Sequence, residues 1–172
     1  MPHPLDRPVW SALTTRQAPL SLGDARALRF APDYAAFGAA ADEEHASQAA
    51  LAALVPPDGE LWLVETDPPA PPPGAVVIKS ALCWQMTAEA LNPAGEPGFE
   101  VTALTDADGP EMLALATLTQ PGPFFVRTHQ LGDFVGVKQD GGLVAMAGER
   151  MRPTGFTEVS GVCTHPDHRG RR

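Results

Sequence analysis

The sixteen residues Thr157-Glu158-Val159-Ser160-Gly161-Val162-Cys163-Thr164-His165-Pro166-Asp167-His168-Arg169-Gly170-Arg171-Arg172 decide the fold of this chain. Residues 157–164 are mostly β-branched or small and contain no proline, which is typical of a largely buried strand. Residues 165–172 then bring proline, arginine and glycine together, which predicts a strand-to-helix turn. Such a turn binds anions, because glycine allows close backbone approach and the following helix presents free N–H groups to a phosphate.

Two longer stretches extend this pattern: "LTQPGPFFVRTHQLGDFVGVKQDG" (118–141) and "GLVAMAGERMRPTGFTEVSGVCTHPDHRGRR" (142–172). Together they resemble the GNAT superfamily of acyl-CoA-dependent N-acyltransferases. The superfamily's signature turn reads Gln or Arg, two residues, Gly, one residue, then Gly or Ala. Gly170 matches the central glycine, whereas Asp167 occupies the first position and Arg172 stands where Gly or Ala is expected.

The order of elements supports the resemblance. The sequence predicts a strand at 101–105, a helix near 110–118 with N-cap candidates in 105–108, and a stop at Gln120-Pro121-Gly122-Pro123. A β-hairpin turning at Asp140-Gly141-Gly142 precedes the strand at 157–164. The implied fold class is α/β (α+β): a partial GNAT fold, with a mixed, mostly antiparallel sheet and flanking helices. We assign residues 99–172 to the N-terminal half of this domain.

A small α+β lobe of unknown role, residues 1–98, precedes it. Residues 42–55 predict a helix that ends at Pro56-Pro57, and residues 60–65 and 75–80 predict strands on either side of a proline-rich loop. Residues 82–91 fit either a strand or a helix, and Trp84 and Met86 are expected in the core. The Pro- and Gly-rich stretch 92–100 marks the boundary between the lobes.

The resemblance implies how the chain would bind acetyl-CoA, its expected co-substrate. The backbone of Val162, Cys163 and Thr164 would contact the pantetheine arm as an added strand would. The backbone N–H groups of the signature turn would hold the pyrophosphate, and arginine side chains there can add charge-assisted hydrogen bonds. The residues implied for the pyrophosphate are Arg169, Gly170, Arg171 and Arg172. The amine acceptor would attack the thioester carbonyl directly, so that the enzyme acts mainly by positioning.

Glu158 is the candidate catalytic residue, because several members of the superfamily use a Glu on this strand as a general base. Strict alternation would place it on the same face as Ser160, Val162 and Thr164, although a bulge would change its face. Cys163, inside an apolar strand and without a histidine partner, is expected to be an inert core residue. The stretch Arg127-Thr128-His129 has two interpretations, an approach to the acceptor site or loop structure.

Composition narrows the class of partner. The chain of 172 residues carries 21 acidic against 12 basic residues, a net charge of −9, which argues against nucleic acid and anionic membranes. The basic residues after position 149 are Arg150, Arg152, Arg169, Arg171 and Arg172, which suits an anionic ligand. Two cysteines form no disulfide framework, no spacing indicates a metal site, and no signal-peptide or spanning segment is evident. A cytoplasmic protein is expected.

The expected function is N-acetyl transfer to a small-molecule or peptide amine. Because the signature turn is reached only at the last residues, we expect this chain to be an incomplete acetyltransferase fragment, with the strand at 157–164 as an exposed edge. The alternative is a catalytically inactive GNAT-like binding protein that pairs through this edge, either with itself as a homo-oligomer or with a complementing chain.

Overall fold

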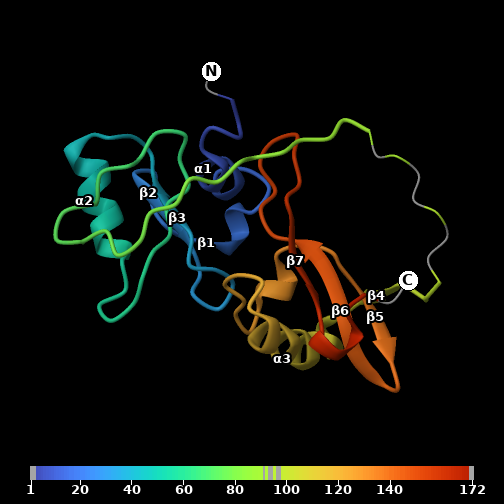
Figure 1. The fold of residues 1–172 in the computed structure, drawn as a ribbon. Coiled ribbons are helices and arrows are strands. Elements are labelled where there is room, and N and C mark those ends of the chain that lie inside the picture. Colours follow the sequence, from blue (N-terminus) through green and yellow to red (C-terminus); the bar gives the residue numbers. More distant parts are fainter. Residues whose placement is uncertain (1–2, 91, 93–94, 96–97, 171–172) are drawn as a thin grey trace.

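The computed structural model describes residues 3–90, 92, 95 and 98–170. Two antiparallel sheets organise the chain, with strand orders β1-β2-β3 and β4-β5-β6-β7. Figure 1 shows them side by side, the first in blue and cyan and the second in yellow to red. The α+β class and the mostly antiparallel sheet predicted from the sequence are therefore confirmed.

The first sheet is built from β1 (Ser21–Gly23), β2 (Ala27–Phe30) and β3 (Gly38–Ala40), packed between helices α1 (Pro8–Leu13) and α2 (His45–Leu54). The predicted helix at 42–55 is confirmed, but it begins three residues later than expected. Asp42 accepts a hydrogen bond from the Glu44 N–H at 3.0 Å, and this local turn takes the place of a first helical turn.

The second sheet is built from β4 (Thr102–Leu104), β5 (Phe134–Gln139), β6 (Gly142–Glu149) and β7 (Val159–Thr164), with α3 (Gly109–Thr119) packed on β6 and β7. Each was predicted from the sequence. Thr105 and Asp108 form the expected cap: the Thr105 N–H and hydroxyl both donate to the Asp108 carboxylate, at 2.7 and 3.0 Å. The helix ends at Gln120, whose φ of 50° is left-handed.

The strands predicted at 60–65 and 75–80 are not formed. Residues 60–65 make a single parallel bridge, between Phe37 and Trp62, and residues 75–80 form neither a strand nor a bridge. Five residues of the loop 66–74 are prolines, which lack an N–H for strand pairing and restrict the backbone, so the loop does not bring residues 75–80 back against 60–65 as a hairpin. Residues 82–90 form neither a helix nor a strand, and Leu91 lies outside the described residues.

The expectation that Trp84 and Met86 belong to the core is wrong. Their side chains are almost fully exposed, because no helix or strand covers the segment that carries them. Figure 1 shows this segment, in yellow-green, crossing between the two sheets. The boundary between the lobes near residue 98 stays a prediction. The main core nevertheless combines residues from both sides of that boundary, including Phe30, Phe37, Leu131 and Met151.

Candidate functional site

Strand β7 is the last strand of its sheet and carries a bulge. Met146 pairs with Cys163 and Gly148 pairs with Ser160, so Ala147 faces two residues, Gly161 and Val162. Gly161 has a φ of +63°, a left-handed conformation that favours glycine. The bulge follows Ser160, so it interrupts the alternation that would have placed Val162 and Thr164 on the same face as Glu158 and Ser160.

A small hollow, with a volume of about 10 Å³, lies beside this bulge. It is lined by the loop after α3 (121–124), by Thr128 and Phe134, by Arg150 after β6, and by Ser160 and Gly161 on β7. Phe124 and Phe134 meet edge to face, with ring centroids 5.9 Å apart. The hollow therefore has an aromatic wall and a polar wall, both next to the strand that the sequence identified as the binding strand.

Glu158 lies just before β7 and is held by Arg150. The Arg150 guanidinium donates twice to the Glu158 carboxylate, at 3.0 and 2.6 Å, and the Met151 N–H donates to the same group at 3.3 Å. The guanidinium also stacks over the ring of Phe37, 4.7 Å from its centroid. The candidate base is thus fixed by a bidentate ion pair whose arginine lines the hollow.

The three residues implied for the pantetheine arm lie on β7 in different environments. Val162 is 61% exposed, whereas Cys163 packs against the core below α3. Burial raises the pKa of the Cys163 thiol, which fits an inert core cysteine better than a nucleophile. The Thr164 carbonyl accepts a hydrogen bond from Arg169 Nε at 3.2 Å. Among the described strands, none pairs with the outer edge of β7.

The turn after β7 begins as the sequence predicts. The His165 N–H donates to the Val144 carbonyl at 2.7 Å, which extends the β6–β7 ladder, and residues 166–168 form a short helical turn. The ring of His168 contacts Gln139 Oε1 at 2.8 Å. Gly170 has a φ of +72°, so its glycine is needed for the backbone conformation. Arg171 and Arg172 lie outside the described residues.

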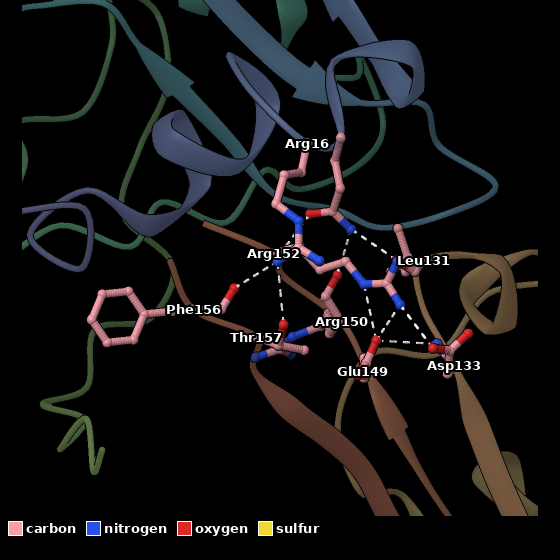
Figure 2. Close-up of polar contacts among 9 residues, drawn as sticks. Arg16, Leu131, Asp133, Glu149, Arg150, Arg152, Phe156 and Thr157 are labelled. Carbon is pink, nitrogen blue, oxygen red and sulfur yellow. Dashed lines mark hydrogen bonds and ion pairs between the residues drawn. The ribbon is translucent and has the colours of Figure 1, made fainter. Parts of the chain in front are cut away.

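Residues of the N-terminal lobe hold the walls of the hollow in place. The Gln17 amide donates to the carbonyls of Leu131 (3.0 Å) and Arg150 (2.8 Å), and its oxygen accepts from the Arg152 N–H (3.0 Å). Its side chain is 3% exposed. Nearby, Arg16 donates to the Phe156 carbonyl and the Thr157 hydroxyl, as Figure 2 shows.

The stretch 127–129 was interpreted either as approaching the acceptor site or as loop structure, and its contacts in the structure bear on this choice. Thr128 Oγ1 accepts from the Phe125 N–H and donates to the Tyr34 carbonyl, both at 2.7 Å, and Arg127 stacks over Tyr34. Thr128 lines the hollow, whereas His129 turns away toward Asp106, 3.2 Å from its carboxylate. The stretch is loop structure that also contributes one residue to the candidate site.

Sequence reasoning did not identify Gln17, Phe124 or Phe134 as site residues. Gln17 contacts residues more than a hundred positions away, so nothing in its local sequence indicates its role. The two phenylalanines could have been noticed, because a Pro-Gly-Pro-Phe loop after a helix and an aromatic residue opening a strand both predict buried rings. Among the described residues, no helix is long and apolar enough to cross a membrane, and no cluster of three metal-ligating side chains occurs.

Comparison with solved structures identifies a protein that is similar over almost the whole of this chain. No protein-family model matches the sequence, and no curated protein does either. The chain is similar to a crystal structure from Novosphingobium aromaticivorans DSM 12444, of an acetyltransferase assigned to the GNAT family. The sequences are 43% identical, the TM-score is 0.84, and the match covers 99% of this chain and 75% of that one.

Proposed function

The chain belongs to the GNAT family of acetyltransferases, and we propose that it binds acetyl-CoA and directs the acetyl group to the amine of a small molecule or peptide. The observation that carries this proposal is the bulged, unpaired edge of β7 next to the hollow at Ser160 and Gly161. An unpaired strand edge offers backbone donors and acceptors to an extended amide-containing arm, as it would to another strand.

Backbone groups of Val162, Cys163 and Thr164 would hold the pantetheine arm on this edge. Arg169 and Gly170, with Arg171 and Arg172, would hold the pyrophosphate. Two features support this assignment: the left-handed Gly170, and the Arg169 side chain that already lies along the edge at the Thr164 carbonyl. A guanidinium in this position can exchange a carbonyl partner for a phosphate, to which its hydrogen bonds are charge-assisted.

For catalysis, we assign Glu158 as the general base that accepts a proton from the acceptor ammonium, directly or through water. The ion pair with Arg150 supports this role by fixing the carboxylate at the start of β7. Phe124 and Phe134 would shield one side of the acetyl group from water, and the deprotonated amine would attack the thioester carbonyl. The amide bond would form as the C–S bond breaks, and CoA would leave as a thiolate that takes a proton from water.

A second candidate function is an inactive GNAT-like binding protein. The observation that favours it is the same ion pair, because both carboxylate oxygens of Glu158 already accept hydrogen bonds from Arg150 and would have to exchange them for contacts with an acceptor ammonium. In this case the edge of β7 would bind a second copy or a complementing chain. The incomplete-fragment interpretation and the cytoplasmic location likewise stay proposals.

Calorimetric titration of the 172-residue chain with acetyl-CoA tests the proposal. We expect saturable binding that weakens about tenfold in Arg169→Ala, since a charge-assisted hydrogen bond contributes about 1.5–3 kcal/mol. Arg26→Ala, an exposed arginine in the β1–β2 turn, is the matched control and should bind as the wild type does. Binding that is absent from the 172-residue chain and present in a version extended beyond residue 172 would support the fragment interpretation. Binding by neither would contradict the cofactor assignment.

A further inference from the structure

The segment 76–90 is the largest exposed apolar stretch among the described residues. Leu82, Trp84 and Met86 are 85%, 87% and 94% exposed, and Val76, Val77 and Ile78 are also exposed. Its only side-chain hydrogen bond among those described is from the Gln85 amide to the Leu5 carbonyl, at 2.9 Å. An exposed apolar stretch of this length is typical of an interaction surface.

The residues of this segment alternate in polarity along the chain. The even positions are mostly apolar: Val76, Ile78, Leu82, Trp84, Met86, Ala88 and Ala90. The odd positions after 77 are mostly polar: Lys79, Cys83, Gln85, Thr87 and Glu89. Period-two alternation predicts a strand with one apolar face, and the segment runs without helical turns in Figure 1. It therefore has the pattern of a strand, but no strand of the described residues pairs with it.

We propose that segment 76–90 pairs with the same segment of a second copy of this chain, in an antiparallel two-fold arrangement centred on Trp84. A two-fold axis through an even residue pairs even positions with even positions, so the apolar faces of both copies lie on one side of the new ladder. Leu82 then faces Met86 of the second copy, and the two Trp84 side chains lie next to each other across the axis.

Charge complementarity selects this register. Lys79 and Glu89 are the only charged residues in the segment, and both are exposed. They lie five positions before and after Trp84, so Lys79 of each copy stands directly opposite Glu89 of the other. Two symmetric ion pairs result. Shifting the register by two residues would lose both pairs, and shifting it by one would place apolar residues against polar ones.

The test uses two charge-reversal variants. In K79E both copies carry two acidic residues in the ladder, and in E89K both carry two basic residues, so each variant alone faces like charges. Sedimentation velocity of the wild type should show a species of twice the 18.1 kDa chain mass. Each variant alone should dimerise at least about tenfold more weakly. An equimolar mixture should restore dimerisation, because K79E and E89K form both ion pairs with each other.

Arg26→Glu, an exposed charge reversal outside the segment, should dimerise as the wild type does. Circular dichroism on each variant separates loss of association from loss of folding. Either of two results would overturn the proposal: a wild type that is monomeric at all concentrations, or a mixture that associates no better than its components. A version extended beyond residue 172 that becomes monomeric while burying Trp84, seen as a blue-shifted tryptophan emission, would assign the segment to an intramolecular partner and also overturn it.

Discussion

Arg150 and Glu158 face each other across the connection between β6 and β7, joined by two hydrogen bonds of 3.0 and 2.6 Å. Backbone hydrogen bonds between Arg150 N–H and Glu158 carbonyl, and between Glu158 N–H and Met151 carbonyl, close the same connection. The pair therefore links Glu158, the hollow and the start of β7.

If Glu158 is the base, Glu158→Gln should lower kcat by about 10²–10⁴-fold, because general-base catalysis contributes a factor of this size. The KM for acetyl-CoA should stay within about twofold, since the glutamine amide still hydrogen-bonds to Arg150. Steady-state kinetics measure both. Glu149→Gln is the matched control, because Glu149 lies on the same connection and pairs with Arg152 outside the hollow. Equal losses in both variants would mean that Glu158 acts structurally.

Gln17 should be the most important polar residue between the two sheets. Gln17→Leu keeps the volume but leaves the buried carbonyls of Leu131 and Arg150 and the N–H of Arg152 without a partner. We expect a loss of about 3 kcal/mol in the free energy of unfolding, given about 1–3 kcal/mol for each unsatisfied buried group and partial relaxation. Urea denaturation measures it. Gln48→Leu, which removes one exposed hydrogen bond to Asp42, should cost far less.

How far the sequence predicts this structure depends on the range of the interactions. The hairpin of β5 and β6, the Thr105 cap on the short helical turn that leads into α3, and the strand β7 follow from residues a few positions apart, and all were predicted. The environment of residues 75–90 was not, because a strand pattern fixes the faces of a segment but does not supply a partner for it. The exposed Trp84 is the clearest consequence.

The candidate site shows the same limit. Glycine within an apolar strand indicates a bulge, so Gly161 carried the signal that the alternation from Glu158 to Thr164 would be interrupted. Glu158 is held by Arg150, which lies just after β6, and Arg150 in turn contacts Phe37 and Gln17, more than a hundred residues earlier in the chain. These contacts depend on how the two sheets pack, which local patterns do not specify.

Asp108 should give the stability of the chain a dependence on acidic pH. The pKa of the Asp108 carboxyl is lowered from 3.8 to about 2. The hydrogen bond that Lys138 donates to it is the largest cause, and the hydrogen bonds from Thr105 come next. A carboxyl whose pKa is lower in the folded state stabilises that state above the unfolded value, and this contribution is lost as the pH falls from about 4 to about 2. In Asp108→Asn, the free energy of unfolding should change less with pH between about 4 and about 2 than it does in the wild type. Chemical denaturation at several pH values measures the slope, and Asp167→Asn, at an exposed aspartate in the final turn, serves as the comparison variant.

The Phe134 ring should make alanine substitutions costly at two glycines, Gly148 on β6 and Gly161 on β7. A Cβ at Gly148 would lie 2.3 Å from the Phe134 ring, so Gly148→Ala forces the ring to move and should cost about 1–3 kcal/mol. Gly161→Ala meets the same ring at 3.2 Å and must also adopt a φ of +63°, which costs about 1–2 kcal/mol. Thermal unfolding measures the loss of stability in both variants.

Gly141→Ala is the control for backbone strain. Gly141 also has a left-handed φ, but a Cβ there would meet no other atom within 4 Å, so this variant measures the cost of the backbone conformation alone. Phe134→Leu should relieve the Gly148→Ala clash, and a double variant no more stable than the sum of its single changes would show that ring contact is not the cause.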